Sequence, residues 1–220
     1  MLMTGKEYIE SLRKLNTRVY MFGEKIDNWV DHPIIRPSIN SVAMTYDLAH
    51  DPEYKDVMTA KSNLTGKIVN RFSHLHQSTE DLKNKVKMQR LLGQKTGSCF
   101  QRCVGMDAFN AVYSTTFETD EKYGTDYHKN FVEYLKFVQE NDLIVDGAMT
   151  DPKGDRGLAP HAQKDKDMYL RIVERKSDGI VVRGAKAHQT GSINSHEHII
   201  MPTVAMKEDD KDYAVSFACP

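Results

Sequence analysis

The strongest constraint on the fold is a change of residue pattern near Leu143. Before it, apolar side chains recur with the spacing of amphipathic helices. One such stripe consists of Phe131, Tyr134, Leu135 and Val138. After it, β-branched and aromatic residues gather in short runs separated by turn residues, such as the hairpin-forming pair Asp178-Gly179. The pattern predicts the α+β class, with a mainly helical domain over residues 1–142 and an antiparallel β domain over residues 143–220.

Local signals predict the positions of individual elements. Thr4 and Glu7 have capping-box spacing, so a first helix is expected to start there. Further helices are predicted from Thr79, over 107–121 and over 127–140, within a region from Ser38 to about Asn141 that we interpret as mostly helical. Strands are predicted over residues 18–22, 169–173, 179–183, 198–201 and 213–217. Pro33 and Pro37 predict an extended segment between the first strand and the helices.

The composition excludes several classes of protein. Thirty basic and thirty-one acidic residues give a net charge of −1, which disfavours nucleic acid as the main partner. The sequence contains no apolar run long enough for a membrane span or a signal peptide. Three cysteines are too few for a disulfide framework. We therefore expect a soluble cytoplasmic protein without a membrane partner.

The cysteine pair Cys99 and Cys103 is the most chemically specific feature. If this segment is helical, the four-residue spacing places both sulfurs on one face. Two thiolates in that arrangement are able to hold zinc or two corners of an iron–sulfur cluster. Two buried cysteines acting as small apolar side chains are the alternative, and the spacing alone favours that alternative. Cys219 is not an obvious third ligand.

Two glycine-bearing loops are further candidates for a binding site. Residues 149–156 contain Gly154, which permits a positive φ or close backbone approach, and Arg156, which is able to bind an anion. Residues 184–192 offer backbone amides, the hydroxyl of Thr190 and the imidazole of His188. Ordinary polar connections would use the same residue types, and neither loop is a dinucleotide-binding or phosphate-binding glycine motif. The nearby pair of histidines at 196 and 198 lacks a third metal ligand, so surface or packed side chains are the simpler interpretation.

Three segments resemble a known family. The segments 94–110, 142–156 and 184–198 closely resemble the cluster-binding and flavin-contacting segments of the 4-hydroxybutyryl-CoA dehydratases, and the resemblance extends over the whole chain. The wider family includes the 4-hydroxyphenylacetate 3-monooxygenases and has an acyl-CoA dehydrogenase-like fold. The resemblance implies that a C-terminal helical bundle follows the β domain, and that the complete protein is a homotetramer. It also implies FAD and a [4Fe–4S] cluster, with Cys99 and Cys103 as two cluster ligands and one cysteine and one histidine from the further chain.

The reaction that the resemblance implies is the dehydration of an acyl-CoA thioester, 4-hydroxybutyryl-CoA, to crotonyl-CoA. This chemistry uses a flavin radical mechanism with the cluster as Lewis acid, and isomerisation of vinylacetyl-CoA accompanies it. It belongs to 4-aminobutyrate degradation or to another pathway through crotonyl-CoA. We expect the 220 residues alone to be inactive, because the remaining cluster ligands and the principal bases would lie outside them.

The resemblance also assigns residues. Those expected to contact the flavin are Met149, Thr150, Asp151, Asp155, Arg156, His188, Gln189, Thr190 and Gly191. Thr190 is the leading candidate for a catalytic residue, as a hydroxyl donor to the flavin ring, and Arg90 and Gln101 are expected to reach the substrate. One alternative function is a two-component FAD-dependent phenol monooxygenase with structural cysteines. Another is a zinc-stapled helical module that binds protein partners.

Overall fold

The computed structural model describes residues 2–220, which form two compact units. The first unit extends to Val145 and includes the later segment Ile193–His196. The second comprises Asp146–Ser192 and Glu197–Pro220. Helices dominate the first unit and strands dominate the second, as the change of residue pattern near Leu143 predicts. The predicted domain limits, residues 1–142 and 143–220, stay a prediction.

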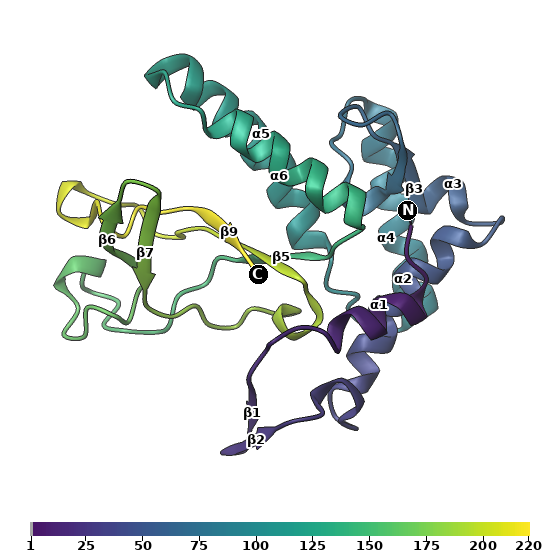
Figure 1. Ribbon diagram of the computed structural model, residues 1–220, viewed down its shortest axis with the longest axis horizontal. Coiled ribbons are helices and arrows are strands. Elements are labelled where there is room, and N and C mark those ends of the chain that lie inside the picture. The colour runs from purple at the N-terminus through teal and green to yellow at the C-terminus, as the bar shows by residue number, and fades with distance from the viewer. Residues whose placement is uncertain (1) are drawn as a thin grey trace. The chain divides into compact units, whose positions relative to one another are not determined.

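The elements are numbered in chain order, and Figure 1 labels the α-helices and all strands except β4 and β8. In the described residues the α-helices are α1 (Gly5–Leu12), α2 (Arg36–His50), α3 (Lys55–Met58), α4 (Thr79–Thr96), α5 (Cys103–Tyr123) and α6 (Tyr127–Asn141). The strands are β1 (Val19–Met21), β2 (Glu24–Ile26), β3 (Thr59–Lys61), β4 (Ile68–Asn70), β5 (Val145–Ala148), β6 (Arg171–Lys176), β7 (Gly179–Arg183), β8 (Glu197–Ile200) and β9 (Phe217–Cys219). No helix in residues 2–220 has the length and apolar content needed to cross a membrane.

Helix α1 begins with the predicted capping box. The Thr4 hydroxyl accepts a hydrogen bond from the Glu7 amide at 3.2 Å, and the Glu7 carboxylate accepts one from the Thr4 amide at 2.7 Å. These two bonds satisfy amide groups that a helix start leaves without partners. The helix then buries Tyr8 against α2, where its ring stacks on Tyr46 with centroids 4.9 Å apart.

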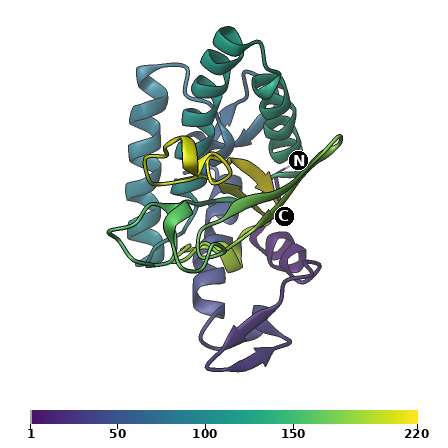
Figure 2. The ribbon, with the colours of Figure 1, turned by 90° about the vertical axis from the view of Figure 1, so that its left-hand side faces the viewer.

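Helices α5 and α6 confirm the periodicity of the sequence. They are joined by a three-residue turn and lie side by side in both ribbon views (Figures 1 and 2). Gly124, with φ of 66°, ends α5 in the left-handed conformation that glycine adopts without strain. The predicted stripe of α6 turns Phe131, Leu135 and Val138 into the interior. Figure 2 also shows the antiparallel β1–β2 hairpin, in purple.

The second unit contains two small sheets. Strands β6 and β7 form an antiparallel hairpin whose turn is the predicted Asp178-Gly179. A three-stranded sheet has the order β5–β8–β9, and β8 and β9 pair antiparallel. The α+β class is therefore confirmed.

Several predicted elements were wrong in position. The last strand begins at Phe217 rather than at Tyr213, because the Tyr213 amide donates to the Asp210 carbonyl and closes a local turn. The predicted extended segment was wrong, because residues 33–35 form a turn that leads into α2. Pro37 lies in the first turn of that helix, where its missing N–H has no intrahelical partner to lose. The region predicted as mostly helical also contains the β3–β4 hairpin.

Candidate functional site

The two glycine-bearing loops lie against each other in the second unit. The Ala187 amide donates a hydrogen bond to the Thr150 carbonyl at 2.9 Å, which joins the backbones directly. The Gln189 side chain adds two bonds, because its Nε2 donates to the same carbonyl at 2.8 Å and its Oε1 accepts from the Met149 amide at 3.2 Å. The structure therefore brings together two segments that are far apart in the sequence.

A buried ion pair lies behind these loops. Lys186 donates to the Asp151 carboxylate with an Nζ–Oδ1 distance of 2.6 Å, and the two side chains are only 9% and 7% exposed. The second oxygen of Asp151 accepts a hydrogen bond from the Thr203 hydroxyl at 3.1 Å. Both carboxylate oxygens are thus engaged by protein groups. The predicted contact of Asp151 with a cofactor stays a prediction, and its observed partners are structural.

The turn that carries Arg156 is held by a buried glutamine. The Gln163 Nε2 donates to the Asp155 carbonyl at 2.8 Å and to the Leu158 carbonyl at 3.1 Å, while its Oε1 accepts from the Asp155 amide at 3.0 Å. A Cβ atom added at Gly154 would lie 2.4 Å from the same Oε1 atom, so glycine permits this close approach. Arg156 is exposed, and its guanidinium forms no ion pair within residues 2–220, which leaves its donors available for an anion.

The loops border an open hollow of about 700 Å³ in the second unit. Its lining residues are Thr150, Asp151, Pro152, Lys153, Arg156, Gly157, Leu158, Ala159, Pro160, Tyr169, His188, Thr203, Val204 and Ala205. That volume falls within the range of small-molecule and cofactor sites, roughly 300–1,000 Å³. The lining mixes apolar surface with two cationic side chains, which suits a ligand with a ring and an anionic group.

Thr190 lies in a tight turn beside the hollow. His188 has a φ of 58° and Gly191 a φ of 100°, so the turn uses the left-handed region twice. The Thr190 amide donates to the His188 carbonyl at 3.1 Å, and the Thr190 side chain is exposed. Its hydroxyl forms no hydrogen bond within residues 2–220, so it is available to a ligand.

The cysteine pair lies in the first unit but not on one helix. Gly97, with φ of 61°, ends α4, Cys99 lies in the following turn, and Cys103 is the first residue of α5. The two cysteines therefore do not share one face of a continuous helix, and the helical arrangement considered from the sequence is wrong. Cys99 is exposed and Cys103 half-buried, and burial together with the nearby Cys99 thiol raises the pKa of Cys103.

The donor set of this turn is incomplete for a metal. Within residues 2–220, no group of three or more histidine, cysteine or acidic side chains has the geometry to hold an ion. Two thiols at a turn, one of them exposed, are the type of donor that holds two corners of an iron–sulfur cluster, and the predicted cluster stays a prediction.

The turn between the cysteines is fixed by its neighbours. Gln101 has a φ of 60°, and its Oε1 accepts a hydrogen bond from Asn194 Nδ2 at 2.5 Å. Arg102 is buried over the ring of Tyr46, 4.5 Å from its centroid, and donates to the Thr45 hydroxyl at 2.9 Å. Arg90 lies exposed on α4 and forms no side-chain hydrogen bond or ion pair in the described chain. The roles of Gln101 and Arg90 stay predictions.

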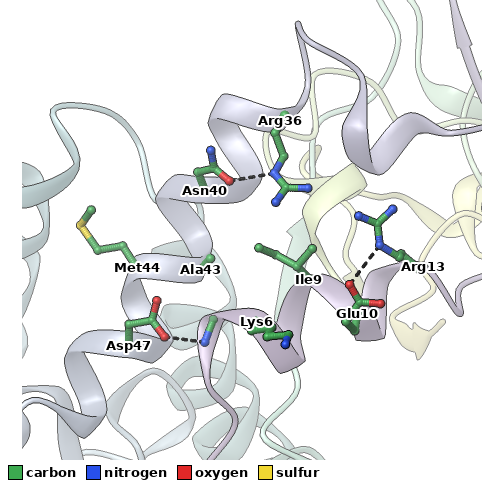
Figure 3. Close-up of a pocket in the computed structure, with 10 residues that line it drawn as sticks. Lys6, Ile9, Glu10, Arg13, Arg36, Asn40, Ala43, Met44 and Asp47 are labelled. Atoms are coloured by element: carbon green, nitrogen blue, oxygen red, sulfur yellow. Dashed lines mark hydrogen bonds and ion pairs between the residues drawn. The ribbon is translucent and has the colours of Figure 1, made fainter.

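A second hollow, of about 460 Å³, lies between α1 and α2 (Figure 3). Most of its polar groups engage one another. Arg36 donates to Asn40 at 2.9 Å, Arg13 pairs with Glu10 at 3.3 Å, and Asp47 accepts from the Gly5 amide at 2.7 Å. The bond from Gly5 to Asp47 joins α1 to α2, whereas the other two contacts are local to one helix each. We assign no ligand to this hollow.

The sequence reasoning missed three polar residues of the second unit. Lys186 and Gln163 organise the loops, yet neither belongs to a recognisable motif. Asp146 is buried in β5, where burial raises its pKa to about 6 and its Oδ2 atom has no hydrogen-bond partner in the described residues. The His198 Nδ1 atom is 4.0 Å from that oxygen. The sequence feature that could have identified Asp146 is a single acidic residue within an apolar segment.

Comparison with known proteins identifies the family. Residues 4–220 match the family model described as 4-hydroxyphenylacetate 3-hydroxylase N terminal, so the chain belongs to that family. Over all 220 residues it is 82% identical to the 4-hydroxybutyryl-CoA dehydratase/vinylacetyl-CoA-Δ-isomerase of Clostridium aminobutyricum, which confirms the resemblance found in the sequence. It is 30% identical, over the same length, to the oxygenase component of the 4-hydroxyphenylacetate 3-monooxygenase of Thermus thermophilus. The chain spans 45% and 44% of these relatives.

Solved structures show the same relationships. An oxygen-tolerant archaeal 4-hydroxybutyryl-CoA dehydratase from N. maritimus matches with a TM-score of 0.96 and 56% identity, over 100% of this chain and 44% of that one. The oxygenase component of a 4-hydroxyphenylacetate 3-monooxygenase, solved in complex with FAD, matches with a TM-score of 0.79 and 26% identity. That match covers 99% of this chain and 44% of the oxygenase.

Proposed function

We propose that the complete protein dehydrates 4-hydroxybutyryl-CoA to crotonyl-CoA and isomerises vinylacetyl-CoA. The observation that carries this proposal is the 82% identity to a dehydratase/isomerase over the whole chain. Identity to the phenol-type monooxygenases is far lower, at 24–33%. The dehydratase is therefore favoured over a two-component FAD-dependent monooxygenase.

We propose FAD as one cofactor, bound at the hollow beside the two loops. The FAD complex of a related oxygenase supports the cofactor, and the joined loops with their available Arg156 and Thr190 side chains support the place. Arg156 would hold an anionic group of the cofactor, and the amides and hydroxyl of the turn at 188–191 would bond the ring edge. The other flavin contacts expected from the resemblance are part of this proposal.

We also propose a [4Fe–4S] cluster, with Cys99 and Cys103 as two of its ligands. The exposed thiol at the turn and the half-buried thiol at the start of α5 support a partial ligand set. When bound, the flavin would supply one-electron redox chemistry and the cluster a Lewis acid for the leaving hydroxyl. Arg90 and Gln101 would orient the thioester substrate, and Thr190 would donate a hydrogen bond to the flavin.

The architecture and assembly of the complete protein follow from the same resemblance. We propose an acyl-CoA dehydrogenase-like arrangement in which a C-terminal helical bundle completes the two units described here. The homotetramer, the cytoplasmic location and the inactivity of these 220 residues alone rest on the resemblance, and they stay predictions.

The test is an anaerobic preparation of the complete protein. We expect an absorbance spectrum with both flavin and iron–sulfur bands, equal amounts of iron and sulfide, and formation of crotonyl-CoA from 4-hydroxybutyryl-CoA. Flavin without iron, together with hydroxylation of a phenol, would support the monooxygenase instead. Stoichiometric zinc without flavin would support the zinc-stapled module.

A further inference from the structure

We infer that Lys186 is a positioning residue, whose buried ammonium group sets the spacing of the two loops at the proposed flavin site. The inference rests on the proposed function, since it concerns how that site is built. Lys186 lies within the segment 184–198 that carries the resemblance, but neither the sequence motifs nor the resemblance assigned it a role.

The ammonium group of Lys186 is fully used by the protein. It donates to the Asp151 carboxylate at 2.6 Å, to the Met149 carbonyl at 2.9 Å and to the Met201 carbonyl at 2.8 Å. A lysine ammonium has three N–H donors, so none remains for a ligand. The three acceptors belong to two separate segments, one following β5 and the other following β8, while Lys186 itself follows β7. One side chain thus joins three chain segments.

The acceptors lie next to the groups that define the site. Thr150, between Met149 and Asp151, has the carbonyl that accepts bonds from the Ala187 amide and the Gln189 side chain. Thr150 and Asp151 line the hollow, whereas Lys186 does not. Lys186 therefore acts on a bound ligand only through the backbone that it holds.

Stability alone is a poor explanation for this pair. Desolvating an ammonium and a carboxylate costs free energy that their mutual attraction barely offsets, and apolar replacements of buried ion pairs are often neutral or stabilising. A lysine at this position holds its three acceptors in a fixed geometry, and an apolar side chain would not do so. The pair thus stabilises one arrangement of the loops over others.

The experiment separates these two roles in the complete protein. Lys186→Met removes the donors and leaves Asp151 buried without its partner, so the melting temperature should fall. The double variant Lys186→Met/Asp151→Asn removes both charges and should recover most of that loss. Lys211→Met, at an exposed lysine whose side chain has no partner in the described residues, is the matched control and should behave as wild type.

The deciding readouts are loop protection and FAD affinity. In the cofactor-free protein, hydrogen exchange at residues 149–156 and 186–191 should be at least about tenfold faster in both Lys186 variants, including the thermally recovered double variant. The Kd for FAD, followed by flavin fluorescence, should rise about tenfold or more in both.

Two outcomes distinguish failure of the inference from failure of the proposed function. Wild-type loop protection and wild-type FAD affinity in the double variant would overturn the inference, since Lys186 would then only neutralise Asp151. Faster loop exchange in the variants, with no FAD binding by any form including wild type, would support the positioning role and overturn the proposed flavin site.

Discussion

The Nδ1 atom of His196 accepts a hydrogen bond from the Ile144 amide at 3.0 Å, and its Nε2 atom lies 2.7 Å from the Ser11 hydroxyl. An acceptor Nδ1 requires that the nitrogen carry no proton, so this geometry needs the neutral imidazole. Burial, and to a smaller extent the positive charge of Arg102, lower the pKa of His196 to about 4. His196 is therefore a packed histidine that joins α1 to the segment before β5.

This arrangement predicts that His196 makes stability depend on pH. The unfolded histidine binds a proton below about pH 6.5, whereas the folded one resists protonation until about pH 4. Its contribution to stability is present above pH 6.5 and is lost as the pH falls toward 4, by at most about 3 kcal/mol. His196→Asn keeps an acceptor but cannot titrate, so its urea-unfolding free energy should fall less steeply between pH 6.5 and 4.5.

Two buried carboxyl groups act in the opposite direction. Burial raises the pKa of Asp142 and of Asp146 to about 6, so their contributions are present below their unfolded pKa near 3.8 and are lost as the pH rises through 6. For this reason the variant must be compared with wild type at each pH. Identical slopes in the two proteins would contradict the assignment to His196.

A second prediction concerns the contact between α5 and the first residue of β5. A Cβ atom at Gly105 would lie 1.9 Å from the Val145 carbonyl oxygen, and backbone at that distance has to move. Gly105→Ala should destabilise the protein by about 3 kcal/mol or more. Gly93→Ala, in the interior of α4 with nothing within 4 Å, is the matched control and should stabilise by about 0.5–1 kcal/mol. Equal melting temperatures for the two variants would count against this packing.

The elements that sequence predicted best have strong local signals. The start of α1 follows from the Thr4 and Glu7 capping box, and α6 from its amphipathic stripe, both within a residue or two. The turn between β6 and β7 is likewise predicted by its own two residues, the hairpin-forming pair Asp178-Gly179. Such features are decided by residues close together in the chain, and that is why pattern reasoning reaches them.

The elements that were not predicted from the sequence depend on contacts between residues far apart in the chain. Strand β5 is buried along its whole length and contains an aspartate and a glycine, so no alternating pattern marks it. The helical interpretation of the cysteine segment failed because the left-handed Gly97 ends α4 two residues before Cys99. In the candidate site, turn chemistry and resemblance pointed to the two loops, but their contact through Gln189 and Lys186 is formed only by the fold.

The cysteine pair predicts a difference among the three cysteines. Cys103→Ala and Cys99→Ala should each remove most of the cluster iron from the complete, anaerobically purified protein, together with dehydratase activity. Cys219→Ala is the control and should retain both, because Cys219 lies in strand β9 and the resemblance assigns no cluster ligand to it. Circular dichroism should stay close to wild type, since Cys99 is exposed and Cys103 only half-buried. Full iron content in both single variants would exclude these residues as ligands.

Thr190 provides the most direct test of the proposed flavin contact. Its side chain is exposed and its hydroxyl is not used within residues 2–220, so Thr190→Val should leave the melting temperature of the cofactor-free protein unchanged. If the hydroxyl donates to the flavin, losing that bond costs about 0.5–1.5 kcal/mol, which weakens FAD binding up to roughly tenfold. The flavin reduction potential and the turnover rate should change as well, because the bond would be made to the reactive ring. Thr190→Ser keeps the hydroxyl and should restore both, whereas a loss of shape alone would not be repaired by the smaller serine. A valine variant with the reduction potential and rate of wild type would show that Thr190 only forms the turn.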